Sequence, residues 1–310
     1  SFEHLRDWLA CGGAFALALI RLYRLVADNA VDVLYGDPWD TLAPLFAEQG
    51  PLACFLRQHG PHRLGLGGFV DWYLFNATGW DARAESWACF VALALATLLA
   101  IALSVRLRGH LSWHDAAFPL VLLSPVSWET MLLTPFLAHS ILPLLIVMFL
   151  ATAWAMPPSR TQTTAIGLIG SVALFSGFGF CGAFAALALG LIQIARPAEG
   201  SPSLRWRLLP VGLFLVALGV FLSGYVWDPA VPGWRFPVPN WWDYARFPAL
   251  MFTSLLSWRA ITPLSTAVGG AILACCFAAW LRATLLLLKR QDAPRPRAIW
   301  FLITTSLLYA

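Results

Sequence analysis

The sequence predicts an all-α integral membrane protein with about eight or nine spanning helices, which form one transmembrane domain over residues 1–310. Hydrophobic residues make up 59% of the chain and charged residues only 12%, whereas a soluble domain carries roughly 25% charged residues. The apolar runs are long and unbroken, as in residues 88–105, and lack the alternation of a β-barrel. Such runs cross a bilayer as helices because a helix satisfies its own backbone hydrogen bonds in lipid.

The first half of the chain supplies four expected spans. Residues 8–27 form the first, as a signal anchor that is retained because no small-residue cleavage site follows it. Residues 28–85 are polar and aromatic and form a first outer loop. The next three spans are expected at residues 86–105, 115–126 and 131–155.

The second half is interrupted more often. Gly177, Gly179 and Gly182 divide an apolar stretch, so residues 163–195 are either two spans or one re-entrant hairpin. A span at residues 206–225 precedes a second outer loop at residues 226–259, and another span follows at residues 262–288. A ninth helix begins near residue 298 and stops at residue 310, short of the roughly 20 residues that a span needs. We therefore expect this chain to be part of a longer protein.

The positions of Lys and Arg predict the orientation, because short cytoplasmic loops carry an excess of positive charge. These residues gather in alternate short connections, which we place in the cytoplasm. Both long loops then lie on the opposite, periplasmic or extracellular, side. The positive residues of the short connections are Arg106, Arg108, Arg160, Arg196, Arg205, Arg207, Lys289, Arg290, Arg295 and Arg297.

Both outer loops are rich in aromatic residues, which prefer the membrane interface. Trp39 and Trp72 lie in the first loop and Trp241 in the second. We expect amphipathic helices to lie along the membrane surface in both loops, with residues 64–75 and 241–258 as candidates.

The remaining composition limits partners and redox chemistry. None of the six cysteines forms a CxxC pair. We therefore expect the cysteines to be small buried hydrophobic residues, and we expect neither a disulfide framework nor a zinc site. His59 and His62 alone supply two ligands, which do not make a metal site. The net charge of +4 is small, and we expect no nucleic-acid partner.

Two aspartates just past the outer end of the first span are the leading catalytic candidates. Asp37 and Asp40 stand in the segment Tyr-Gly-Asp-Pro-Trp-Asp-Thr. A carboxylate partly shielded by helices can act as a general base, and a second carboxylate can help to hold a divalent cation. The alternative is a structural role in a turn, with Asp40 as the N-cap of a short helix.

A second group of candidates suits an anionic ligand. His59, His62 and Arg63 follow the aspartates by about twenty residues, and arginine binds phosphate in a bidentate manner. Glu129 lies between two apolar segments, where an acid is functional or paired, and Arg57 or Arg63 are its expected partners. His139 lies inside an apolar segment and fits a satisfied core residue better than a ligand.

The order of these motifs resembles a group of bacterial polytopic proteins similar to the GT-C glycosyltransferases. Asp37 and Trp39 match an Asp-Asp-Trp element that follows the first helix, with Pro38 in place of the second Asp. The sequence Gln-His-Gly-Pro-His-Arg at residues 58–63 matches a His-Asn-Glu-His-Arg element, with Pro61 in place of the Glu.

The resemblance continues through most of the chain. Pro125, Trp128 and Glu129 match a Pro-x-Gln-Trp-Glu-Asn element that leads into the fourth helix. Phe-Ser-Gly-Phe-Gly at residues 175–179 resembles a Phe-Ser-Gly-x-Gly stretch, and Tyr225 with the Pro-rich residues after it resembles the loop after the seventh helix.

The resemblance implies a transferase in the bacterial inner membrane that takes a sugar from a polyprenyl-phosphate donor at the outer membrane face. By the pattern of that group, Asp37 is the first choice, and Asp40 the second, for the base or metal partner that activates the acceptor. A cation would be Mg²⁺ or Mn²⁺, held by few protein ligands plus phosphate. The donor phosphate would be held and oriented by His59, His62, Arg63 and Glu129.

Two other classes of function stay open. Pro38 and Pro61 replace acidic residues of the pattern, which favours a non-catalytic accessory subunit that binds other membrane proteins and keeps the fold. A transporter would use the glycine-broken stretch around Gly179 as a discontinuous helix at a site in mid-membrane.

Overall fold

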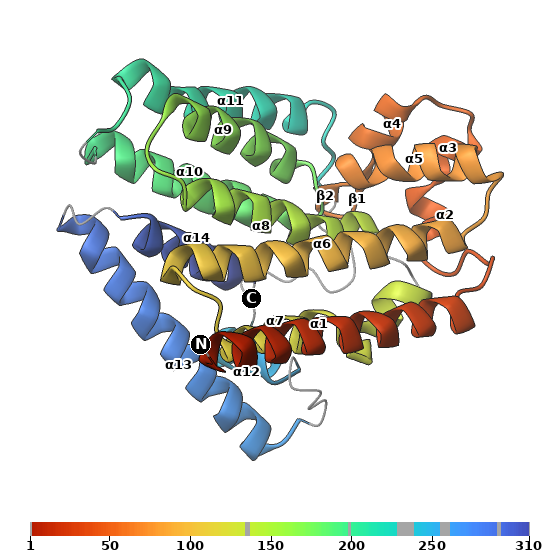
Figure 1. Ribbon diagram of the computed structural model, residues 1–310. Coiled ribbons are helices and arrows are strands. Elements are labelled where there is room, and N and C mark those ends of the chain that lie inside the picture. Colours follow the sequence, from red (N-terminus) through yellow and green to blue (C-terminus); the bar gives the residue numbers. More distant parts are fainter. Residues whose placement is uncertain are drawn as a thin grey trace.

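A computed structural model describes residues 2–133, 137–197, 200–227, 239–254, 261–289 and 293–309. The predicted all-α class is confirmed, because helices make up nearly all of the regular structure in these residues (Figure 1). The exception is a ribbon of two short antiparallel strands, β1 (Gln58–His59) and β2 (His62–Arg63), in which His59 is opposite His62.

Within the described residues, five helices are long and apolar enough to cross a membrane by length and composition: α1 (Phe2–Asn29), α6 (Arg83–Arg108), the stretch Leu137–Trp154, α11 (Leu204–Leu222) and α13 (Pro263–Leu288). These apolar helices suggest a membrane protein. The stretch Leu137–Trp154 consists of the π-helix η4 (Leu137–Ile141) followed by α8 (Leu142–Trp154). Three shorter helices are α9 (Arg160–Leu174), α10 (Gly179–Ala195) and α14 (Pro294–Tyr309).

The predicted helix at residues 115–126 is wrong as a continuous helix. The chain forms η1 (Trp113–Ala116), α7 (Ala117–Leu122), η2 (Pro125–Ser127) and the π-helix η3 (Glu129–Leu133) in its place. Ser112 and Asp115 form a capping box that starts the first turn. Pro125 then ends the helical run, because a residue before proline avoids the α conformation and Ser124 is extended.

The glycine-broken stretch forms two helices. α9 and α10 pack against each other and are joined by residues 175–178. Gly177 adopts a positive φ of 47° in this turn, which glycine tolerates at no steric cost.

Contacts between helix ends fix the direction of each helix. The Glu85 Oε1 atom accepts a hydrogen bond from the Leu137 amide at 3.3 Å, and the Arg106 Nε atom donates to the Ala155 carbonyl at 3.3 Å. α6 and α8 therefore run in the same direction. Residues 113–133, which connect them in sequence, return the chain along α1 (Figure 1). Asp7 near the start of α1 accepts from the Trp113 amide at 3.2 Å, and Ser86 donates to the Met131 carbonyl at 2.8 Å.

Basic residues of the short connections meet at one end of the bundle. Arg196 donates to the Leu288 carbonyl at 2.6 Å, and Arg297 donates to the Met156 carbonyl at 3.1 Å. We call this the basic end. The end that holds β1 and β2 is called the ribbon end. The sides of the membrane that these ends face remain a prediction.

The first long loop, residues 28–85, is folded rather than extended. It contains α2 (Pro38–Thr41), α3 (Ala43–Phe46), α4 (Pro51–Leu56), the β ribbon and α5 (Leu66–Thr78). In the second long loop, residues 228–238 and 255–260 lie outside the described residues, and α12 (Asp243–Ser254) packs against α13. α5 and α12 overlap the two amphipathic helices that the sequence predicts.

The larger of two apolar clusters in the described part of the chain holds the bundle together. Leu22 and Val26 of α1 and Leu150 of α8 are fully buried in it, together with Phe301 of α14. α14 reaches from the basic end to the ribbon end, where the Tyr309 ring meets the Phe178 ring at 4.9 Å. The core therefore places one end of several helices against the folded first loop.

Candidate functional site

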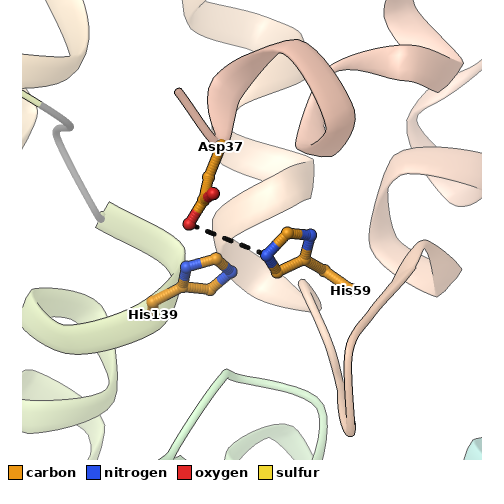
Figure 2. A group of neighbouring side chains, drawn as sticks. All are labelled: Asp37, His59 and His139. Carbon is orange, nitrogen blue, oxygen red and sulfur yellow. Dashed lines mark ion pairs between the residues drawn. The ribbon is translucent and has the colours of Figure 1, made fainter. Parts of the chain in front are cut away.

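Three side chains from separate parts of the chain converge at the ribbon end. Asp37 precedes α2, His59 lies in β1 and His139 lies in η4, and their ligand atoms are all within 4.8 Å of one another. Figure 2 shows the Asp37 carboxylate and both imidazole rings facing one another. The His59 Nε2 atom is 3.8 Å from the Asp37 Oδ2 atom, and the His59 and His139 rings stack at 5.1 Å.

Asp40 supports this group rather than capping a helix. Its carboxylate accepts from the His59 Nδ1 atom at 2.7 Å and from the Arg57 guanidinium at 2.5 Å. Asp37 occupies the N-cap position of α2, without a capping hydrogen bond from its side chain, and Asp40 lies inside the helix, so the N-cap alternative for Asp40 is wrong. Partial burial raises the pKa of Asp40, but the hydrogen bonds from His59 and Arg57 outweigh it and lower the pKa below its usual value.

Arg63 joins the β ribbon to the end of α11. Its guanidinium donates to the Phe221 carbonyl at 2.8 Å, to the Ser223 carbonyl at 2.6 Å and to the Leu56 carbonyl. Arg63 is 5% exposed and lies over the Phe221 ring. These contacts give Arg63 a positioning role, and its binding of phosphate remains a prediction.

Two further contacts dock the ribbon onto the residues after α11. The Gln58 side chain pairs with the backbone of Val226, donating to its carbonyl at 2.7 Å and accepting from its amide at 2.9 Å. The Tyr225 hydroxyl donates to the Pro61 carbonyl at 2.9 Å. Burial raises the pKa of Tyr225, which keeps this hydroxyl protonated as a donor.

The turn between α9 and α10 packs against the backbone of His139. A Cβ atom at Gly177 would lie 2.6 Å from the Ala138 carbonyl oxygen and 2.8 Å from the Cα atom of His139. The Gly177 amide donates to the Arg63 carbonyl at 3.2 Å. Because Gly177 has no side chain, this turn can pack closely against both η4 and the β ribbon.

His62 is a third histidine beside the group. Its side chain is 6% exposed, and its ring lies 4.7 Å from the His139 ring and 6.0 Å from the His59 ring. Within the described residues, neither of its ring nitrogens has a hydrogen-bond partner. Burial, helped by repulsion from His59, lowers the pKa of His62 to about 4, so its ring is neutral at pH 7.

Glu129 is exposed at the start of η3. The sequence predicts an ion pair with Arg57 or Arg63, but Arg57 pairs with Asp40 and Arg63 binds three carbonyls. Glu129 as an orienting residue for the site remains a prediction.

Two buried acids lie behind η4. Asp71 of α5 and Glu85 of α6 are 4% and 5% exposed, and Glu85 holds the Leu137 amide two residues before His139. Burial raises the pKa of Asp71 to about 7. Glu85 therefore joins α6 to η4, and no feature of the sequence other than the acid itself indicates this contact.

A cavity of about 780 Å³ opens beside this region. Val26 of α1, Leu74 of α5, Val91 of α6 and Leu145 of α8 contribute to its apolar wall, and Leu137 also lines it. Asp81 and Arg83 lie in the same lining and form an ion pair at 2.8 Å. An apolar cavity of this size with few polar groups suits a lipid chain, but Asp37, Arg63 and Glu129 do not line it.

The arrangement brings together four of the candidate site residues of the first loop: Asp37, Asp40, His59 and His62. It adds His139, for which the sequence favoured a core role. A carboxylate and two imidazoles facing one another can bind a metal ion or share a proton.

Comparisons of the chain with protein-family models, with curated proteins and with solved structures give no match.

Proposed function

We propose that this protein is a GT-C-like glycosyltransferase that takes a sugar from a polyprenyl-phosphate donor at the outer face of a bacterial inner membrane. The observation that carries the proposal is the meeting of Asp37, Asp40, His59 and His139 at the ribbon end, beside an apolar cavity. Asp37 is half-exposed, whereas Asp40 is held by Arg57 and His59, so Asp37 is the carboxylate we propose as the base.

The proposal includes a topology in which the ribbon end faces the periplasm. In this topology nine stretches of the described residues cross between the two ends, in alternating directions: α1, α6, residues 113–133, the η4–α8 stretch, α9, α10, α11, α13 and α14. Contacts of Arg106, Arg196 and Arg297 at the basic end support this proposal, because short cytoplasmic loops carry an excess of positive charge.

The apolar cavity is an argument that the substrate carries a lipid chain. Its apolar wall between α1 and α6 fits a prenyl chain, and the Asp81–Arg83 pair in its lining offers polar groups to a head group. We expect Ala88→Trp, which fills the cavity, to reduce the copurified prenyl lipid at least about tenfold in native mass spectrometry. Leu168→Trp on the exposed face of α9 is the control and should leave the lipid content unchanged.

Sugar transfer by the purified full chain in nanodiscs tests the activity. We expect Asp37→Asn to lower turnover of polyprenyl-phosphate sugars by at least about 100-fold, the usual contribution of a general base. The control is Glu48→Gln, which changes an exposed acid in the same loop and should keep wild-type turnover. Full turnover in the Asp37→Asn protein would exclude this residue as the base.

An accessory subunit is the second candidate, because Arg57, Asp40 and Arg63 are already held within the chain. Such a subunit would be inactive with every polyprenyl-phosphate sugar and would copurify with another membrane protein in a fixed ratio. Turnover by the isolated wild-type chain would rule it out.

A further inference from the structure

The arrangement around Asp37 has the geometry of a metal site. Ligand atoms around a tetrahedral ion with bonds of roughly 2.1 Å lie roughly 3.4 Å apart. The ligand atoms of Asp37, His59 and His139 lie within 4.8 Å of one another, and the Asp37–His59 pair is separated by 3.8 Å. In no pair are the ligand atoms therefore more than about 1.4 Å farther apart than they would be around one ion, and in the Asp37–His59 pair the excess is less than about an ångström.

The Asp40 carboxylate already orients the His59 ring. Its Nδ1 atom is bound by the Asp40 carboxylate at 2.7 Å, and its Nε2 atom is the one nearer Asp37. Arg57 holds Asp40 in turn at 2.5 Å. Metal-binding histidines use their second ring nitrogen in this way, because a carboxylate partner fixes the ring and raises its basicity.

His62 gives an independent sign that the region accommodates a polar ligand. Its ring is nine-tenths buried and directed at the His139 ring, and both of its nitrogens are without hydrogen-bond partners in the described part of the chain. A buried polar group without a partner costs free energy. A bound ion with its water would supply a partner close to this ring.

We propose that Asp37, His59 and His139 bind one divalent transition-metal ion of the Zn²⁺ type, with Asp40 as the outer partner of His59. Two imidazoles and one carboxylate suit Zn²⁺ and similar ions, whereas Mg²⁺ prefers oxygen ligands. Three protein ligands leave a fourth position open for water or substrate, as in catalytic zinc sites.

This inference changes the predicted ligand set and metal class. The sequence led to Mg²⁺ or Mn²⁺ on Asp37 and Asp40 and to no zinc site, but the Asp40 oxygens are occupied by His59 and Arg57. The metal proposal stands on geometry alone and does not require that the protein transfer sugars.

Zinc binding by the full chain in detergent, purified with a tag that lacks histidine, tests the proposal. After equilibrium dialysis, we expect about one Zn²⁺ per wild-type chain, unchanged by 1 mM Mg²⁺. Asp37→Asn, His59→Ala and His139→Ala should each weaken binding at least about 100-fold, and Asp40→Asn about 10- to 100-fold. His110→Ala, at an exposed position, is the matched control and should bind as the wild type does.

X-ray absorption at the zinc edge of the wild-type protein gives a second result that needs no variant. We expect two imidazole ligands completed by oxygen. A wild-type chain that binds no Zn²⁺, a spectrum with thiolate or only oxygen ligands, or full binding in the folded Asp37→Asn and His139→Ala variants would overturn the proposal. No sugar donor enters these measurements, so a failed transferase assay would not affect them.

Discussion

Arg63 shows how a single residue fixes the position of the candidate site. It is nearly buried and donates to carbonyls of α4 and of the end of α11. We expect Arg63→Ala to lower the free energy of unfolding by about 2–4 kcal/mol, because several hydrogen bonds from a charged donor are lost. The measurement is thermal unfolding of the protein in detergent.

Arg57→Ala is the matched control for this change. Arg57 is one-third exposed and its partner Asp40 is half-exposed, and such ion pairs contribute less than about 1 kcal/mol. If both variants unfolded at the wild-type temperature, Arg63 would not hold the ribbon to α11.

Asp71 makes a prediction about pH. Burial raises its pKa from 3.8 to about 7 in the folded protein, so the folded state holds a proton that the unfolded chain releases between these values. Stability should therefore fall as pH rises from about 4 to about 7 and then level off. Asp71→Asn should flatten this part of the profile in thermal unfolding measured from pH 5 to pH 8.

Asp81→Asn is the comparison for Asp71. Asp81 is paired with Arg83 near the surface, and its replacement should leave the slope between pH 5 and pH 7 as it is in the wild type. A slope equally steep in the Asp71→Asn protein would assign the effect to another group.

At the scale of single residues, the sequence identified Asp37, Asp40, His59 and His62 because they are concentrated in one polar loop. It did not identify His139 as a partner, because that contact depends on how a helix from the middle of the chain meets the first loop. Sequence periodicity predicts on which face of a helix a residue lies. It does not predict which distant segment of the chain packs against that face. For the same reason, the role of Gly177 behind His139 was not predictable.

At the scale of elements, α5 depends on a close approach to the turn after α9. A Cβ atom at Gly65 would lie 1.8 Å from the Phe175 carbonyl oxygen. We expect Gly65→Ala to cost at least about 2 kcal/mol of stability through this clash, measured by thermal unfolding.

Gly79→Ala is a control at a position with open space. Gly65 and Gly79 both have positive φ values, of 56° and 67°, but no atom lies within 4 Å of a Cβ built at Gly79. Gly79 is left-handed helical with a ψ of 40°, which other residues can adopt, whereas Gly65 has a ψ of −130°, which strongly favours glycine. The difference between the two variants therefore measures the contact with Phe175 together with the backbone strain at Gly65. Equal stability of the two proteins would mean that α5 can move away from the turn without cost.

The elements that the sequence predicted well are the long apolar runs, because length and hydropathy alone define them. The helix expected at residues 115–126 was wrong, since hydropathy does not register the capping box at Ser112 or the extended Ser124 before Pro125. The folded first loop was also beyond prediction, because its pieces are short and are held by contacts distant in sequence, such as Gln58 with Val226.

At the scale of the whole molecule, the two ends of the bundle should label from opposite sides of the membrane. We expect Asp37→Cys to react with an impermeant maleimide added outside intact cells and His110→Cys to react only after permeabilisation. Both changes are made in a protein whose exposed Cys275 is replaced by serine. Labelling of position 37 only after permeabilisation would reverse the orientation and exclude a site at the outer face.

α6 and α8 point the same way, and residues 113–133, which connect them in sequence, return the chain without one continuous apolar helix. Among the described residues, α6 is long and apolar enough to cross a bilayer by itself, whereas no helix within residues 113–133 is. We therefore expect this stretch to insert during synthesis only by packing against the α1 helix already in the membrane, which contacts η1 and α7. In a polypeptide released before this packing, we expect α8 to point in the opposite direction.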